Sequence, residues 1–449
     1  MTSLKKISTI IPSALCIFVL HGCGSSSTDS AGESFTAQES ASVAEPLSVA
    51  EQLSVEESLS VAEPLLGEAL ASTSAAELVS IRDLSFVGAF ALPTAEDSVS
   101  TLDYSTGVIE VNGDSLFIAG HDHHDAIAEF VIPDLVASTR IADLNIAEAP
   151  RQSFVKLLDR AASGNPESLD EITGLEVAGK RLVINAIEYY DAPADNQLTT
   201  LVVEDAHDLH NSAVGSFRSI EGYARAAGWL SAIPEVWQPL LGGSHISGNS
   251  SGSPIIGRHS VGPSAFAIDL DAAVAAPGEA VIQSKELLGF SLEQPLNEDL
   301  SNEGGQNKLW THLSQAQFGF IVPGTKTYMT LGSSGGHQTG IGYKISQTDG
   351  NLCGGFCAAD AKDSYNFYWL WSLDDLLQVK SGSIDPHTIK PYESGQLELP
   401  FQTDNTHRPI GGASFDPVRN LLFISLLTAN NELGQYNNPP IIVAYRFSL

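Results

Sequence analysis

Pairs of short apolar runs, each joined by a tight turn rich in Gly, Asn or Asp, recur along most of the chain. Such a pair predicts a β-hairpin, because these residues supply the backbone conformations that short hairpin turns require. The predicted hairpins join 108–111 to 115–119, 174–177 to 181–184, 318–322 to 327–331, and 412–415 to 421–424. Further apolar runs predict third strands at 127–132, 198–203, 265–270, 365–371 and 441–447. Helical character is confined to short segments, of which 222–230, 271–276 and 373–379 are the best. The domain is therefore predicted to be all-β.

The spacing of these units predicts a ring of sheets. A hairpin, a loop and a further strand recur about every 65–95 residues, which is typical of β-propeller blades. The run 84–92 has no partner before it, so we expect it to pair with the C-terminal strand and close the ring without exposed sheet edges. The segment Gly411-Gly-Ala-Ser-Phe-Asp-Pro417 resembles a phrase common in bacterial propeller domains, where a Gly-Gly pair enters an innermost strand. The prediction is a propeller of five to seven blades over 81–449, with a β-sandwich or β-helix as the alternative. We expect the aromatic segment 228–237 to form a capping loop.

The first residues have the pattern of an export signal. Lys5 and Lys6 precede an apolar stretch at 7–20, which is too short to span a membrane as a helix but has the length of a signal-peptide core. The stretch ends in Leu20-His21-Gly22-Cys23, which resembles the lipobox of bacterial lipoproteins, with His21 where the family prefers a small residue. The resemblance implies a signal peptide over 1–22, a lipid on Cys23, and a protein anchored in the cell envelope. Gly24 after the cysteine favours the outer membrane, with the domain facing the periplasm or the cell surface.

A repetitive acidic segment separates this signal from the propeller. Residues 23–80 are mostly Ser, Ala and Glu, and they contain four copies of a six-residue repeat beginning at Ser42. A period of six fits no continuous helix, and Pro46 and Pro64 interrupt it. This composition buries too little apolar surface to offset the entropy of ordering, so we expect a disordered spacer between membrane and domain.

The net charge bears on the possible partners, and the cysteines bear on a possible disulfide. The net charge of −32 argues against nucleic acid, because binding phosphates requires clustered Lys and Arg. Cys353 and Cys357 flank a Gly-rich loop, and in an exported protein they predict a small disulfide.

Polar residues that follow the second strand of each hairpin are the candidate site, because equivalent positions of successive blades surround one end of a propeller channel. The candidate catalytic residues are His121, His123, Tyr190, Arg258, His259 and His337, and the candidate ligand-binding residues are Glu188, Tyr189 and Asp191. His245, which comes shortly after the aromatic segment 228–237, is a further candidate ligand-binding residue. Histidine and tyrosine suit general acid–base chemistry, arginine neutralises a carboxylate, and tyrosine faces stack on sugars.

A metal is the one cofactor that the sequence suggests. His121, His123 and Asp125 are the candidate ligands, and calcium or zinc the candidate ions; if the preceding strand continued, the two histidines would share one face. The segment nearly matches the metallo-β-lactamase signature, but Ala126 stands where that family has its last histidine. Two Gly-x-Ser-x-Gly segments, around Ser250 and Ser334, lack the helix that follows a nucleophile elbow.

The sequence therefore predicts an envelope lipoprotein whose propeller binds an extracellular polar ligand, a small molecule or a polysaccharide. Two alternatives stay open. One is a propeller enzyme, either a His/Tyr polysaccharide lyase or a metal-assisted hydrolase or lactonase. The other is a scaffold in an envelope protein complex.

Overall fold

The computed structural model describes residues 76–94, 97–191, 193, 195–251, 260–402, 407–434 and 436–448. The predicted signal peptide, the lipobox with Cys23, and the linker up to residue 75 lie outside the described residues. Residues 76–80 already pack on the domain: the side chain of Val79 is buried, and its N–H donates to Thr327 Oγ1 at 3.1 Å. Among the described residues, no helix combines the length and apolar character needed to cross a membrane.

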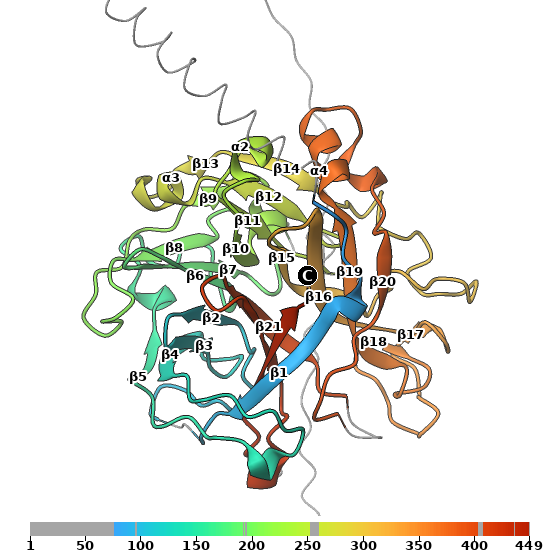
Figure 1. Cartoon of the computed structure of the whole chain (residues 1–449), viewed down its shortest axis with the longest axis horizontal. Helices are drawn as coiled ribbons and strands as arrows, with labels where there is room; N and C mark the ends of the chain where they lie inside the picture. The colour runs from blue at the N-terminus through green and yellow to red at the C-terminus, as the bar shows by residue number, and fades with distance from the viewer. Residues whose placement is uncertain are drawn as a thin grey trace, which may run out of the picture. The chain divides into compact units, whose positions relative to one another are not determined.

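Five antiparallel sheets surround a common centre and form a five-bladed propeller (Figure 1). Blade 1 is β2 (Ile109–Asn112), β3 (Ser115–Ala119), β4 (Ala126–Val131) and β5 (Gln152–Lys156); blade 2 is β6 (Glu171–Ala178), β7 (Arg181–Ile187) and β8 (Thr200–Val203). Blade 3 is β10 (Trp229–Ala232), β11 (His245–Gly248), β12 (Ala265–Ile268) and β14 (Ser284–Leu288). Blade 4 is β15 (Gln315–Ile321), β16 (Thr327–Gly335), β19 (Ser364–Ser372) and β20 (Glu393–Gln396); blade 5 is β21 (Ile410–Asp416), β22 (Leu421–Leu426), β23 (Ile441–Phe447) and β1 (Leu84–Ala91). The all-β propeller prediction is confirmed, at the lower end of the expected number of blades.

Short elements decorate the blades. The paired strands β9 (Ser219–Ile220) and β13 (Val281–Ile282), and β17 (Ile341–Tyr343) and β18 (Phe356–Ala358), form two small additional sheets. The α-helices are α2 (Gln238–Leu241), α3 (Leu270–Ala275) and α4 (Leu373–Lys380). The 3-10 turns are η1 (Ile81–Asp83), η2 (Ile141–Asp143), η3 (Leu158–Arg160), η4 (Tyr223–Ala226), η6 (Pro386–Thr388) and η7 (Asn431–Leu433). Cys353 and Cys357 form a disulfide beside β18.

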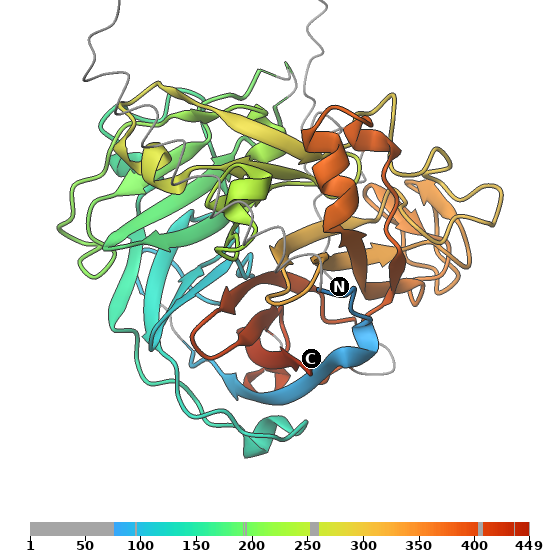
Figure 2. The ribbon, with the colours of Figure 1, turned by 45° about the horizontal axis from the view of Figure 1, so that its top comes forward.

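The ring closes as the sequence predicts. Strand β1, blue in Figures 1 and 2, pairs antiparallel with the red strand β23 from Leu84 opposite Phe447 to Ala91 opposite Ile441. The first and last strands of the described domain thereby lie in one sheet, with β1 as its outer strand. Isolated bridges from Ala89 to Val136 and from Ala91 to Ile146 cover part of its outer edge.

The innermost strands β2, β6, β10, β15 and β21 contact one another around the centre. Glycine permits this approach in the first half of two of these strands. A Cβ on Gly174 of β6 would lie 1.9 Å from the carbonyl oxygen of Gly228, just before β10. A Cβ on Gly412 of β21 would lie 2.7 Å from the carbonyl oxygen of Gly107, just before β2. The Gly-Gly pair noted in the sequence thus sits where two inner strands nearly touch.

The predicted capping loop at 228–237 is wrong. Trp229–Ala232 is β10, the innermost strand of blade 3, and its partner β11 begins only at His245. The connection between them is long and contains α2, so the hairpin lacks the tight Gly or Asn turn that identified the other blades. The helix expected at 222–230 is likewise reduced to η4 followed by this strand.

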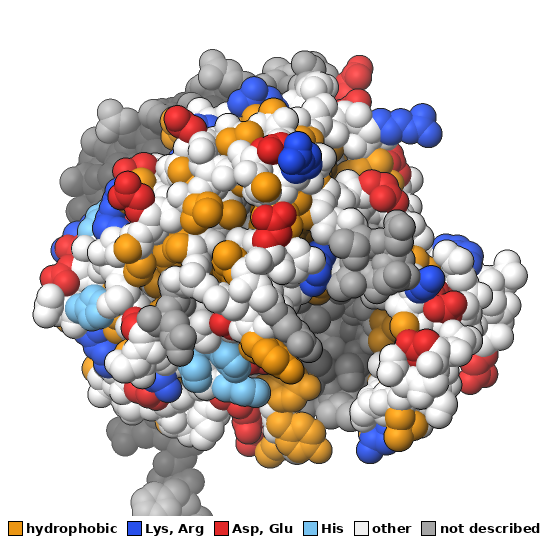
Figure 3. All heavy atoms as spheres, turned by 90° about the horizontal axis from the view of Figure 1, so that it is seen from below, with side chains coloured by type: hydrophobic (Ala, Val, Ile, Leu, Met, Phe, Trp, Pro, Cys, Tyr) orange, Lys and Arg blue, Asp and Glu red, His pale blue; other side chains and the backbone are white. Residues whose placement is uncertain are grey.

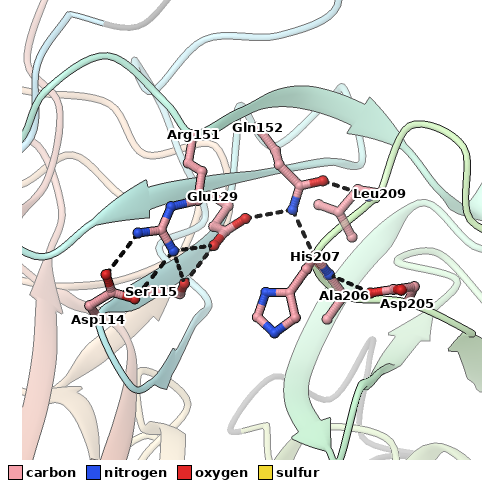
Figure 4. A network of polar contacts seen from close by, with 9 residues as sticks. All are labelled: Asp114, Ser115, Glu129, Arg151, Gln152, Asp205, Ala206, His207 and Leu209. Atoms are coloured by element: carbon pink, nitrogen blue, oxygen red, sulfur yellow. Dashed lines mark hydrogen bonds and ion pairs between the residues drawn. The ribbon is translucent and has the colours of Figure 1, made fainter.

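A buried polar network holds blade 1 against the loop that follows β8 (Figure 4). Glu129 on β4 is fully buried; it accepts hydrogen bonds from Ser115 Oγ, Arg151 Nη1 and Gln152 Nε2. Gln152 also donates to the carbonyl oxygen of Ala206 at 2.8 Å. A buried carboxylate is tolerated here because several donors replace its lost hydration.

Candidate functional site

A cavity of about 320 Å³ opens at the end of the channel where all five inner strands begin. We call it the tyrosine mouth. Its lining residues include the first residues of each inner strand or those just before it: Thr106, Val108, Glu171, Ile172, Thr173, Ile187, Tyr189, Gly228, Trp229, Asn249, Gln315, Ala316, Gln317 and Gly411. This set is rich in amides and hydroxyls and, among the described residues, contains no Lys or Arg.

The turn between β3 and β4 gathers three imidazoles beside this mouth. The strand ends at Ala119 and does not continue, so the rings meet through a turn and not along one strand face. The His121 ring lies 5.4 Å from the His123 ring and 4.6 Å from the His124 ring, centroid to centroid. The His121 backbone bridges to Ser105, one residue before Thr106 in the mouth. Figure 3 shows histidine side chains gathered on the face it displays, with acidic and hydrophobic side chains beside them.

Carboxyl groups of blades 1 and 2 meet between this turn and the mouth. Burial, followed by the charge of Asp170, raises the pKa of Glu171 to about 7. The same two causes raise the pKa of Asp125 to about 7. Both side chains therefore exchange a proton near neutral pH, and each can donate as well as accept a hydrogen bond.

Two tyrosines project from the loop after β7. The side chains of Tyr189 and Tyr190 are 58% and 62% exposed, and Tyr189 lines the mouth. The Tyr189 backbone N–H donates to Asp170 Oδ1 at 2.7 Å, which fixes the start of the loop. Exposed aromatic rings on an anchored loop provide flat apolar faces next to the polar cavity.

The rest of that loop is held by its own side chains. Asp191 is 1% exposed and accepts the backbone N–H groups of Asp195 and Asn196 at 3.0 and 3.2 Å. The Glu188 backbone N–H donates to Asn196 Oδ1 at 3.2 Å. Asp191, expected to bind ligand, thus shapes the loop that presents the tyrosines.

The two threonine hydroxyls in the mouth differ in their hydrogen bonding. Thr106 Oγ1 is buried and makes no hydrogen bond to any described residue, whereas Thr173 Oγ1 donates to the Ala227 carbonyl oxygen at 2.7 Å. Leaving a buried hydroxyl unpaired costs free energy, so Thr106 is a position that a polar ligand would satisfy.

Two predicted site residues lie elsewhere. His337 is 5% exposed; its Nε2 lies 2.7 Å from Ser334 Oγ and its Nδ1 2.9 Å from the Asn307 carbonyl oxygen, so both ring nitrogens are engaged inside blade 4. Ser334 itself is 1% exposed, which removes it as an accessible nucleophile. His245 begins β11 instead of following it, and it therefore lies at the opposite end of the channel, 3.5 Å from Glu176. Arg258 and His259 lie outside the described residues.

The predicted metal ligands do not form a metal centre. Among the described residues, no group of three or more His, Cys, Asp or Glu side chains has an arrangement that would hold an ion. Within the turn, His121 Nδ1 accepts the His123 backbone N–H at 3.1 Å and lies 2.8 Å from Asp122 Oδ1. The Nδ1 atom of His121 is thus engaged within its own turn.

Sequence reasoning missed Glu171, Asn249, Gln315 and Gln317. It examined the ends of second strands, whereas most of these residues lie at the starts of first strands. In an up-and-down blade these two positions meet at the same end of the channel, so the first polar residues of the inner strands were the available signal.

Comparison with known protein families and with curated proteins returns no match. Solved structures with similar folds include an alpha-L-arabinofuranosidase from Podospora anserina, in complex with cellotriose, at 12% identity and a TM-score of 0.32, covering 80% of this chain and 97% of that one. The catalytic domain of a Coprinopsis cinerea GH62 alpha-L-arabinofuranosidase has 12% identity and a TM-score of 0.30, with the same coverage. The phage phi92 endosialidase has 11% identity and a TM-score of 0.33, covering 81% of this chain; this chain spans about half of that one, 51%.

Proposed function

We propose that the tyrosine mouth binds a neutral, hydroxyl-rich ligand, namely a segment of extracellular polysaccharide. The observation that carries the proposal is the meeting of amides, hydroxyls and partly protonated carboxyls at the start of all five inner strands, beside two exposed tyrosines. Sugar hydroxyls both donate and accept hydrogen bonds, and sugar rings pack on aromatic faces. Acidic glycans fit less well, because Asp122, Asp170 and Glu171 are near neighbours and the described lining residues carry no basic group.

Calorimetric titration of the purified chain with neutral and with acidic oligosaccharides tests this function. We expect measurable affinity for at least one neutral glycan, and a much weaker response to acidic ones. Binding of acidic glycans alone would overturn the proposal.

Hydrolysis of the bound glycan is the second candidate. A carboxyl whose pKa is about 7, as for Glu171 and Asp125, keeps a proton to give to a leaving oxygen at neutral pH. The test is release of reducing ends from a glycan that binds, with Glu171→Gln expected to abolish release while binding persists. If the wild-type chain releases no reducing ends, the hydrolysis proposal is wrong and the mouth is a binding site only. The lyase alternative is not proposed, because His337 is enclosed in blade 4 and does not join His121.

We further propose that the chain is held in the envelope by a lipid on Cys23. The support is the lipobox-like sequence ending at Cys23 and the acidic repeat that follows it. Covalent acyl chains tether a protein by about 0.8 kcal/mol per buried methylene. We expect Cys23→Ser to move the protein from the membrane fraction to the soluble fraction after export; retention in the membrane would contradict the anchor.

A further inference from the structure

The opposite end of the channel, where the inner strands finish, contains a larger cavity of about 730 Å³. We call it the glutamate mouth. Its charged lining residues are Glu110 of β2, Glu176 of β6 and Glu235 after β10, and the described lining contains no Lys or Arg. Three phenylalanines, Phe318, Phe320 and Phe415, form part of the wall. The cavity has the size of a small-molecule site.

Glu110 is held in place between three blades. Its side chain is 7% exposed; Oε2 accepts Ser414 Oγ of blade 5 at 2.9 Å, and Oε1 accepts the Val177 N–H of blade 2 at 3.3 Å. Burial, followed by the charge of Glu176, raises the pKa of Glu110 well above its ordinary value. Burial and the neighbouring carboxyl thus favour the protonated form of Glu110, and an approaching positive charge would favour the ionised form.

Glu176 faces the cavity beside His245. Burial raises the pKa of Glu176 to about 8 and lowers that of His245 to about 4. The pair is thus an uncharged acid and an uncharged imidazole, with Glu176 Oε1 3.5 Å from His245 Nε2. A buried carboxyl in this state gains most from a cationic partner, because the cation removes the cost of ionisation.

A polar atom in the wall independently indicates a ligand. Ser231 of β10 is 5% exposed and lines the cavity, and its hydroxyl has no hydrogen-bond partner in the part of the chain that the structure describes. Aromatic faces are present in the same wall, where Phe320 and Phe415 stack with centroids 4.9 Å apart. An unpaired buried acceptor, carboxyls and aromatic rings in one cavity match a ligand that carries N–H donors and positive charge.

We propose that the glutamate mouth is a binding site for a protonated aliphatic amine. Its ammonium group donates to Ser231 Oγ and pairs with the carboxylates of Glu110 and Glu176, while its methylene groups pack on the phenylalanine rings. The ligand brings positive charge, the carboxyl that pairs with it ionises, and the displaced proton passes to solvent. This site is independent of the tyrosine mouth, because the two cavities share no lining residue.

The titratable groups around the site determine how binding depends on pH. Facing one another are Glu110 of β2, Glu176 of β6 and His245 of β11, with Glu235 also in the lining; the charges of Asp269 and Asp271 act on His245. Since the carboxyls must ionise, affinity for an amine rises as pH increases towards about 8 and proton release falls.

Calorimetric titration of the full chain with spermidine tests the proposal. The titration is carried out at about pH 6 and at about pH 8, in buffers that differ in their heat of ionisation. We expect saturable binding that is tighter at the higher pH and accompanied by proton release at the lower. Glu176→Gln, which preserves shape, should weaken binding at least about tenfold, and Ser231→Ala about threefold to tenfold. The matched control is Glu432→Gln, which removes an exposed carboxyl on η7 and should leave affinity unchanged.

Three outcomes would overturn the site. One is absence of saturable binding; another is equal binding by wild type, Glu176→Gln and Ser231→Ala, which would reduce the effect to attraction by the net charge. The third is tighter binding of calcium chloride than of spermidine with the same variant dependence, which would make it a metal site. Thermal unfolding of each variant verifies that the fold is retained; should Glu176→Gln unfold, the Ser231→Ala comparison decides alone.

Discussion

The two mouths of the channel are built on the same five strands but have opposite characters. Strand β6 contributes to both, with Glu171 at its start and Glu176 five residues later near its end. Burial raises both pKa values, to about 7 and about 8. At the tyrosine mouth the neighbours are carboxyls and exposed tyrosines, whereas at the glutamate mouth the neighbouring carboxyl of Glu110 is accompanied by a histidine and phenylalanines. One strand thus places a glutamate in each mouth, and the residues around each glutamate determine which kind of ligand it is suited to bind.

The dependence of stability on pH should distinguish the two mouths most strongly. Because the folded pKa values of Glu171 and Glu176 lie above the ordinary value of 4.5, the folded state holds these protons more tightly than the unfolded state. Stability therefore falls as pH rises from about 4.5, by at most about 3 kcal/mol for Glu171 up to pH 7, at 1.4 kcal/mol per pKa unit. Urea unfolding of wild type, Glu171→Gln and Glu176→Gln between about pH 5 and 8 measures this. Above about pH 7, Glu176→Gln should reduce the slope of stability against pH more than Glu171→Gln does. Equal slopes for the two variants would contradict this difference between the mouths.

Removing a carboxyl at the glutamate mouth should cost more stability than removing a ring at the tyrosine mouth. Glu110→Ala leaves the Ser414 hydroxyl and the Val177 N–H without their acceptor in a buried place, at a cost of about 2 kcal/mol. Tyr189→Ala removes a largely exposed ring and should stay within about 0.5 kcal/mol of wild type. Chemical denaturation of both variants compares them, with Glu110→Gln expected to be milder than Glu110→Ala. Equal losses of stability in Glu110→Ala and Tyr189→Ala would contradict the proposed difference between the two mouths.

Affinity for a neutral glycan should show the reverse order, with a larger loss for Tyr189→Ala than for Glu110→Ala. Tyr189→Ala removes a stacking surface worth about 1 kcal/mol, which corresponds to a loss of about fivefold in affinity. The control is Tyr343→Ala on β17, a tyrosine that is 49% exposed and absent from the mouth lining. Direct titration checks both, and an equal loss in the control would mean that the effect is not local to the mouth.

The smallest effect should come from the histidine turn. His123 has a side chain that is 83% exposed, and the described turn holds no metal arrangement. We expect that a chelator shifts the melting temperature by less than about 1 °C and that His123→Ala changes glycan affinity less than twofold. A marked destabilisation by the chelator, relieved by zinc or calcium, would restore the metal hypothesis.

Local patterns predicted the architecture well where turns were tight. The turns at Asn112 and Gly179 marked hairpins of blades 1 and 2, and the unpaired run at 84–92 predicted ring closure. The inner hairpin of blade 3 was missed because the connection from β10 to β11 is long, although the run at 265–270 did predict its third strand, β12. Its two inner strands are also only four residues each, too short for a clear alternation.

The candidate site was predictable only in part, because sequence shows neither strand direction in space nor internal pairing. Tyr189, which follows a second strand, lines the tyrosine mouth. His245 starts its strand and so lies at the other end of the channel. His337 occupies the expected loop, but its two ring nitrogens bond inside blade 4. Glu176 lies inside a predicted strand, where nothing local distinguishes a channel-facing acid from one facing solvent.

The most direct test of the account is a glycan array probed with three proteins in parallel: wild type, Tyr189→Ala and Glu176→Gln. The account predicts that the wild-type chain binds neutral glycans, that Tyr189→Ala loses most of this signal, and that Glu176→Gln keeps it. Loss of signal in Glu176→Gln with full binding by Tyr189→Ala would contradict the assignment of the glycan to the tyrosine mouth.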